Sequence, residues 1–166
     1  MSSQPEPKLP RVPELVGATG NSFQLTGVPT HIDLPVQEPT GPAALEPEEL
    51  ANWAPPRVFL NLERMIGELG APPFSVYLNL PPGENSESHP ELLAGDLPMF
   101  GLREASISDE RHTPNGLYTQ LDITGVYSRL ALMDNWNPRN LRVTFVPKYP
   151  GKLPPVKVGR MSLYFA

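Results

Sequence analysis

Residues 57–66, RVFLNLERMI, and residues 74–80, FSVYLNL, decide the fold of this chain. In the first stretch the apolar Val58, Leu60 and Leu62 occupy every other position, and the second stretch alternates in the same way. A period of two is typical of a strand that buries one face. A short segment with two glycines and two prolines separates the stretches. We therefore predict that they pair as the central hairpin of a β-sandwich.

The rest of the chain repeats this alternation between segments rich in turn residues. One segment differs, because Val126, Leu130 and Met133 recur at helical spacing and predict one short helix. About eight strands with regular turn signals indicate an all-β fold, an antiparallel β-sandwich of jelly-roll type. The further strands are expected at residues 22–28, 30–36, 92–102, 117–123, 141–147 and 156–165.

Proline content sets the domain organisation. The 23 prolines among 166 residues disfavour long helices and favour short strands with many corners. Residues 1–14 form a predicted extended Pro-rich arm, and residues 15–166 form a single β-sandwich domain. Within this domain, residues 37–56 are predicted to be a Pro-rich crossing.

Charge and composition exclude several classes of partner. The net charge of −5 gives no basic surface for nucleic acid or an anionic membrane. The first residues show no signal peptide, and no apolar run is long enough to span a membrane. We expect a soluble protein, cytoplasmic unless it is exported with a partner. The chain has no cysteine, so thiolate metal sites and a cysteine nucleophile are excluded.

The three histidines give the chain one candidate metal site, and the carboxylates of its two long loops give another, for Ca²⁺ or acid/base chemistry. His31 lies in a predicted strand, whereas His89 and His112 lie in polar loops. A mononuclear site could assemble from all three, with Asp109 or Glu110 near His112, but isolated loop histidines are usually solvated. The sequence also lacks the usual nucleophile and phosphate-binding motifs. We therefore assign no catalytic, cofactor-binding or metal-binding residue.

Four aromatic residues at strand spacing have two interpretations. Phe59, Tyr77, Phe145 and Phe165 could form a platform for a ligand. Burial in the core explains them without a ligand, because each buried side chain contributes about 1.5–3 kcal/mol. We predict that they pack in the core or between the sheets.

The order of several short motifs resembles the region that follows the copper-binding core in bacterial tyrosinases. The same outline is similar to the C-terminal domain of plant polyphenol oxidases. The resemblance extends over about residues 12–165, and each motif alone is weak. The motifs are LVGAT at 15–19, QLTG at 24–27, VFLNLE at 58–63, YLNLP at 77–81, HPELLAG at 89–95, MFG at 99–101, NGL at 115–117, LDIT at 121–124 and NLRVTFVP at 140–147.

This resemblance implies a β-sandwich that packs on a helical type-3 copper domain. In that family two copper ions are each held by three histidines, and phenols are oxidised to o-quinones. The present chain has three histidines in all. We therefore expect no cofactor in this chain and a di-copper centre in a partner domain, joined in cis or present as a separate subunit.

The resemblance also implies that such a domain covers the copper pocket, often with one bulky side chain inserted in place of substrate. Our candidates for this plug are Met99, Phe100 and Leu102, with Tyr149 behind them. The alternative is that Phe100 simply packs in the core.

Three functions follow from these observations. The first is a non-catalytic accessory domain of a tyrosinase-like phenol oxidase, acting as a lid, an inhibitor, or an aid to folding and copper loading. The second is an independent sandwich that binds a carbohydrate or a protein. The third is a small metalloenzyme that uses the loop histidines.

Overall fold

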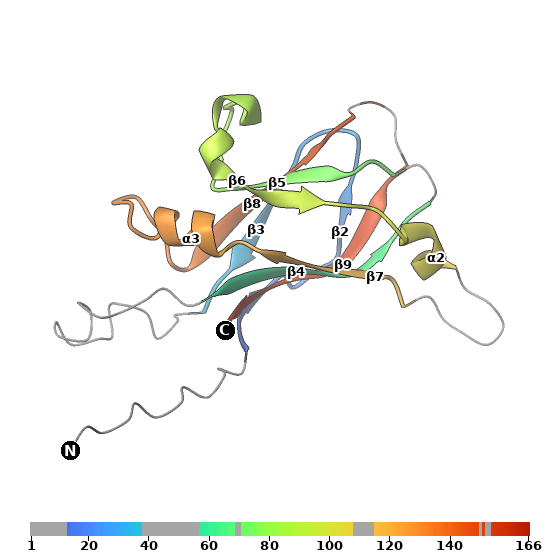
Figure 1. The fold of residues 1–166 in the computed structure, drawn as a ribbon, viewed down its shortest axis with the longest axis horizontal. Helices are drawn as coiled ribbons and strands as arrows, with labels where there is room; N and C mark the ends of the chain where they lie inside the picture. Colours follow the sequence, from blue (N-terminus) through green and yellow to red (C-terminus); the bar gives the residue numbers. More distant parts are fainter. Residues whose placement is uncertain (1–12, 38–56, 69–70, 108–114, 150, 152–153) are drawn as a thin grey trace, which may run out of the picture.

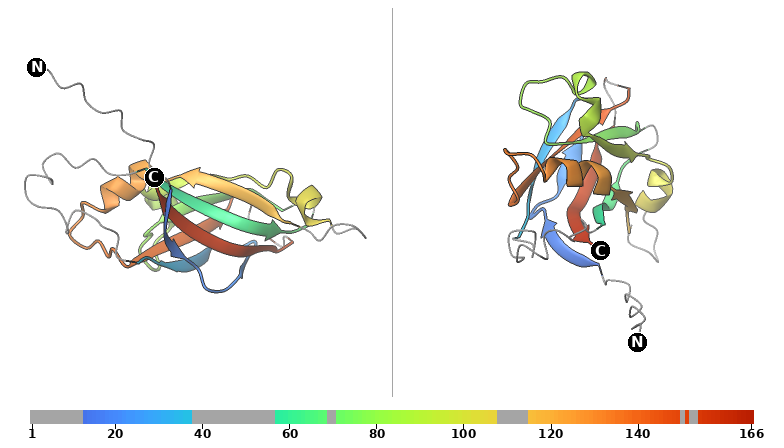
Figure 2. Two further views of the ribbon diagram at one scale, coloured as in Figure 1. Left: turned by 90° about the horizontal axis from the view of Figure 1, so that it is seen from below. Right: turned by 60° about the vertical axis from the view of Figure 1, so that its left-hand side comes forward.

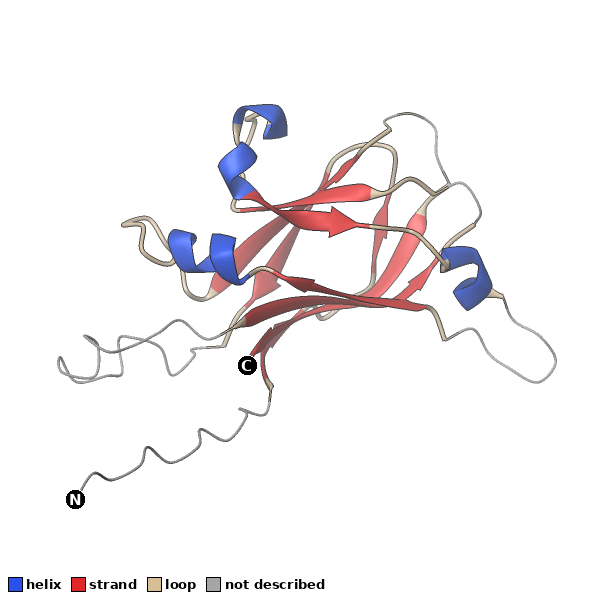
Figure 3. Ribbon diagram, in the orientation of Figure 1, coloured by secondary structure: helices blue, strands red, loops and turns tan. Residues whose placement is uncertain are grey.

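The structure is a computed structural model, and it describes residues 13–37, 57–68, 71–107, 115–149, 151 and 154–166. Two antiparallel sheets pack face to face, with one short helix at each end of the molecule (Figure 1 and Figure 3). Seen from below, the sheets form two layers (Figure 2). The predicted all-β sandwich is therefore confirmed.

The larger sheet has five strands, and β9 (Val156–Phe165) lies at its centre. β9 pairs on one side with β4 (Val58–Ile66) and on the other with β1 (Glu14–Ala18) and β2 (Phe23–Leu25). β7 (Leu117–Asp122) pairs with β4 and completes the sheet.

The smaller sheet has four strands in the order β3, β8, β5, β6. β3 (Thr30–Pro35) lies at one edge, a position that tolerates Pro35, its last residue. β6 (Leu93–Leu97) lies at the other edge, beside β5 (Phe74–Leu78). β8 (Asn140–Pro147) joins β3 to β5.

The predicted hairpin between residues 57–66 and 74–80 is wrong. These stretches form β4 and β5, which belong to different sheets. The intervening segment carries the chain from one layer to the other. Their alternation was predicted correctly, because Val58, Leu60 and Leu62 are fully buried between the sheets.

The core is built from the inward rows of both sheets. Phe74, Val76 and Leu78 of β5 face Leu60 and its neighbours from the opposite layer, and all are at most 1% exposed. Burying side chains of this kind contributes about 1.5–3 kcal/mol each and holds the layers together. The sandwich is thus a rigid support for the loops at its two ends.

The described residues contain two α-helices, where the sequence predicted one. α3 (Thr124–Leu130) matches the predicted helix and buries Val126, Tyr127 and Leu130. α2 (Leu102–Ser106) was not predicted, because five residues are too short for a helical period. No helix among the described residues is long and apolar enough to cross a membrane.

The predicted arm and crossing fall largely outside the described residues. Of the arm, residues 1–12 are not described, and Glu14 already pairs with Phe165 as the first residue of β1. Of the crossing, only Gln37 is described, and its backbone N–H donates to the carbonyl of Val16 at 2.8 Å.

Candidate functional site

Phe100 stands at the corner of a tight turn that follows β6. The backbone N–H of Leu102 donates to the carbonyl oxygen of Met99 at 3.2 Å, which closes the turn. Gly101 has φ 82° and ψ 3°, the values of the third residue of a type II turn, where glycine is preferred. The Phe100 side chain is consequently 94% exposed.

The helix α2 anchors this turn on the sandwich. Leu102, its first residue, is only 2% exposed and belongs to the core. The hydroxyl of Ser106 accepts a hydrogen bond from the backbone N–H of Gly67 at 3.0 Å, which ties α2 to the end of β4. The Gly116 N–H donates to the carbonyl of Ala105 at 3.0 Å. The exposed ring is therefore presented from a turn held by the core and by two neighbouring segments.

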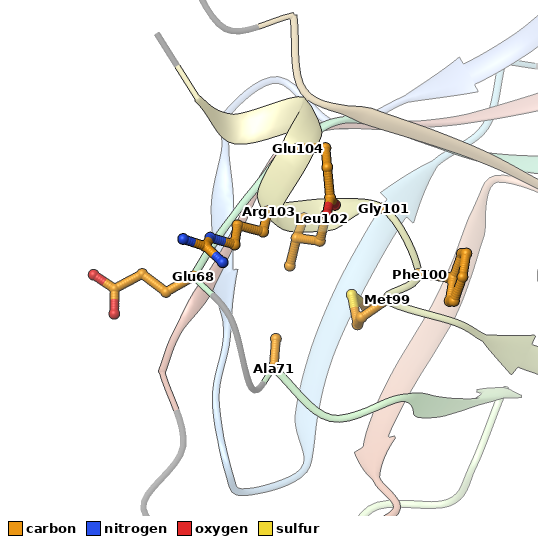
Figure 4. A pocket seen from close by; sticks show the side chains of 8 residues that line it. All are labelled: Glu68, Ala71, Met99, Phe100, Gly101, Leu102, Arg103 and Glu104. Carbon is orange, nitrogen blue, oxygen red and sulfur yellow. The ribbon is translucent and has the colours of Figure 1, made fainter.

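A hollow of about 460 Å³ lies beside the turn (Figure 4). Met99 and Phe100 border it on one side, and Glu68 and Arg103 border it on the other (Figure 4). Ala71 and Leu102 add further apolar surface. An apolar edge facing a charged one suits contact with another surface better than enclosure of a small ligand.

The structure separates the four plug candidates. Phe100 is exposed, so the alternative that it packs in the core is wrong. Met99 is partly buried against the core. Leu102 is only 2% exposed and belongs to the core, so it contributes at most a small part of the floor of the hollow. Tyr149 is 68% exposed.

Phe100 and Tyr149 lie at the same end of the smaller sheet. Phe74 of β5 pairs with Leu97 on one side and with Pro147 on the other, so the ends of β6 and β8 are aligned. The Nζ atom of Lys148 lies 2.9 Å from Oδ2 of Asp96 and bridges these two strands. The two exposed candidates therefore lie at one end of the sheet, although Tyr149 does not line the hollow beside Phe100.

The histidines do not assemble into a metal site within the described chain. The Nδ1 atom of His31 lies 2.7 Å from the Thr144 hydroxyl on the outer face of the smaller sheet. His89 lies in the β5–β6 loop between Glu84 and Glu91. His112, Asp109 and Glu110 fall outside the described residues. No group of three His, Cys, Asp or Glu that could hold a metal occurs among the residues described.

The four strand aromatics mostly fulfil their predicted packing role. Phe145 is fully buried, and Tyr77 and Phe165 are partly buried against the core. Phe165 also meets the ring of Tyr127 edge-on, with centroids 5.7 Å apart. Phe59 differs, because it lies on the outer face of the larger sheet with the Arg57 guanidinium 5.5 Å from its ring centroid.

Two features of possible function were missed from the sequence. The turn that exposes Phe100 has a signal in Gly101, since glycine at that position suits a type II turn. The contacts of His89 with two carboxylates have a weaker signal in the sequence. Glu84 and Glu91 lie within five residues of His89, but such spacing alone does not show that the side chains meet.

Comparison with known proteins places the chain in a family. Residues 12–166 match the family described as "Domain of unknown function (DUF7868)". The chain belongs to this family. It is also 27% identical to Tyrosinase HcTyr1 of Hahella sp. (strain CCB-MM4) over 153 residues, which cover 91% of this chain and 32% of that protein. Thus the chain spans about a third of the length of this relative.

Among solved structures, the chain is similar to latent apple tyrosinase (MdPPO1), with a TM-score of 0.45 and 16% sequence identity. The match covers 90% of this chain and 27% of that one. Homology to the tyrosinase of Hahella confirms the resemblance that the sequence motifs indicate.

Proposed function

We propose that this chain is a non-catalytic accessory domain of a tyrosinase-like di-copper phenol oxidase. One observation carries the proposal: nearly the whole chain aligns with HcTyr1, yet the alignment covers only 32% of that protein. The domain covers or regulates the copper site, or assists folding and copper loading. The copper domain is joined in cis or is a separate subunit.

The chain itself does not fit a di-copper centre. The family resemblance implies six histidine ligands, whereas this sequence contains three histidines. The two described histidines are engaged with Thr144 and with a pair of glutamates. Phenol oxidation would therefore depend on ligands from the partner domain.

The Met99–Phe100 turn is the proposed contact with that partner. A phenyl ring that is 94% exposed gains about 1.5–3 kcal/mol when an apolar pocket covers it. The turn is closed by a backbone hydrogen bond and anchored by Leu102, so docking costs little conformational entropy. Tyr149 at the same end widens the contact.

The test is to add the purified chain to a tyrosinase-like copper domain and measure phenol oxidation. We expect the rate to fall with added chain, and Phe100→Ala to relieve this inhibition. Leu132→Ala is the matched control, because Leu132 is 84% exposed but follows α3 at the opposite end (Figure 1). An oxidation rate that neither the chain nor its variant alters contradicts the lid function.

A folding or copper-loading role predicts a different result. Co-expression with the chain would raise the copper content of the partner domain, while addition after purification would leave its rate unchanged. Copper analysis of the partner, expressed with and without the chain, distinguishes this role from the lid.

The alternative is an independent module that binds a carbohydrate or a protein, and one surface favours it. Phe59 and Tyr164 pair across β4 and β9 on the outer face of the larger sheet. Both side chains are partly exposed there. Aromatic rings on an open sheet face suit sugar rings and peptides. Glycan-array binding that Phe59→Ala abolishes would support this alternative.

A further inference from the structure

His89 is held between two carboxylates in the loop that joins β5 to β6. Its Nδ1 atom lies 2.9 Å from Oε1 of Glu91, and its Nε2 atom makes a hydrogen bond with Oε2 of Glu84. A neutral imidazole has one N–H, whereas the imidazolium has two. Both contacts are hydrogen bonds at the same time only when His89 carries its proton.

The surrounding loop is built in two short turns of 3-10 helix. These are η2 (Ser86–Ser88) and η3 (Pro90–Leu92), and His89 joins them. The His89 N–H donates to the carbonyl of Ser86 at 3.0 Å, and the Leu92 N–H donates to the carbonyl of His89 at 3.0 Å. The backbone of His89 therefore links the two turns.

The loop is fastened to the rest of the molecule on its β6 side. Leu92 is 8% exposed and belongs to the core. From α3, the Nη2 atom of Arg129 donates to the backbone carbonyl of Glu91 at 3.3 Å. Leu92 therefore anchors the loop in the core, and Arg129 ties its backbone to α3. The His89 contacts fix the part of the loop farther from the core.

We propose that Glu84, His89 and Glu91 form a pH-dependent clasp, which holds residues 84–92 folded against α3 and opens when His89 loses its proton. This inference is independent of the proposed function, because the loop precedes β6, whereas the Met99–Phe100 turn follows β6 at its other end, beside α2 (Figure 1).

The groups around the His89 ring determine the direction in which its pKa shifts. The hydrogen bond with Glu91 raises the pKa of His89 above its ordinary 6.5, Glu84 adds to this, and partial burial opposes it. In turn, the hydrogen bond with His89 lowers the pKa of Glu91 below 4.5, and the Arg129 charge contributes. The carboxylates come from the loop itself, and Arg129 comes from α3.

The clasp is therefore fully formed over a limited pH window. The stabilisation from a raised histidine pKa is complete below 6.5 and disappears as pH rises through the folded value. The stabilisation from a lowered glutamate pKa is complete above 4.5 and disappears as pH falls through its folded value. The loop should be most rigid between these limits.

His31 provides an internal reference within the same chain. Burial is the largest influence on it and lowers its pKa, the positive charge of Arg142 lowers it further, and Asp33 opposes both. The two imidazoles should consequently titrate in opposite directions from the ordinary value. NMR titration of the whole chain, with the ring signals assigned by His31→Gln and His89→Gln, measures both.

Amide hydrogen exchange tests the clasp itself. We expect the Leu92 amide, corrected for the intrinsic pH dependence of exchange, to lose about tenfold in protection as His89 deprotonates. His89→Gln should abolish this step, and His31→Gln should preserve it. Glu84→Gln combined with Glu91→Gln should lower the His89 pKa toward 6.5. A His89 pKa no higher than that of His31, or Leu92 protection that is constant across the titration, overturns the proposal.

Discussion

Arg160 of β9 donates two hydrogen bonds to the carboxylate of Glu63 of β4 on the outer face of the larger sheet. Its Nε atom donates to Oε2 at 2.8 Å, and its Nη2 atom donates to Oε1 at 3.2 Å. The Ser162 hydroxyl donates to the same Oε2 at 2.7 Å. Burial of Glu63 acts to raise the pKa of its carboxyl, but the bonds from Arg160 and Ser162 outweigh it and lower the pKa below 4.5.

The first prediction concerns this pair. Glu63→Gln should reduce the free energy of unfolding at pH 7 by about 1 kcal/mol, a modest value because the pair is partly exposed. Since the folded pKa is lowered, this loss should shrink as pH falls from 4.5 through the folded value. Urea denaturation at several pH values measures it. Glu87→Gln, a change at an exposed loop carboxylate, is the control. If both variants lost the same free energy of unfolding at pH 7, the Glu63–Arg160 pair would not be the source of the stabilisation.

A second prediction separates the exposed ring from its anchor. Leu102→Ala should lower the free energy of unfolding by about 2–5 kcal/mol, because it leaves a cavity in the core. Phe100→Ala, two residues earlier, should change it by less than about 0.5 kcal/mol, because the ring is 94% exposed. Thermal or urea unfolding of the two variants tests this. A large loss in Phe100→Ala would show that the ring supports the fold.

The third prediction tests a close approach of two loops. A Cβ atom added at Gly27 would lie 1.7 Å from the carbonyl oxygen of Gly151, so the β2–β3 and β8–β9 loops would have to separate. Gly27→Ala should therefore cost about 1–3 kcal/mol of stability. Gly20→Ala is the matched control, because no atom lies within 4 Å of its added Cβ. Similar stabilities of the two variants would be inconsistent with this packing.

A fourth prediction concerns the junction of β7, α3 and β4. The Thr124 hydroxyl accepts a hydrogen bond from the Val58 N–H at 2.9 Å and donates to Oδ1 of Asp122 at 2.6 Å. Thr124→Ala leaves the Val58 N–H without this partner and should cost about 1–3 kcal/mol. Thr124→Ser keeps the hydroxyl and should lose less than half as much. Denaturation midpoints of both variants show which of them loses more stability. A larger loss in Thr124→Ser than in Thr124→Ala would show that the hydroxyl is not the stabilising group.

Strand positions and their buried faces could be predicted from the sequence, whereas strand partners could not. The alternation of Val58, Leu60 and Leu62 correctly identifies their face, because period-two burial is a local property. The pairing of β4 with β7 and β9 depends on residues about sixty and a hundred positions away. A glycine- and proline-rich link suits a hairpin or a crossing between layers equally well.

At the candidate site, side-chain type was predictable and exposure was not. Phe100 sits between Met99 and Gly101, next to the apolar Leu102, so the segment resembles a core strand. The turn sends Phe100 outward and Leu102 inward within three residues. The helix α2 that holds them is fixed by contacts with Gly67 and Gly116, which are distant in sequence.

The central position of β9 has a consequence for biosynthesis. The strand pairs with β1, β2 and β4, so three partners made much earlier must wait for residues 156–165 to leave the ribosome. Until then their edges are open to mispairing, and closing such distant contacts is intrinsically slow. Translation that stops before Val156 should therefore yield an aggregation-prone chain with no completed larger sheet.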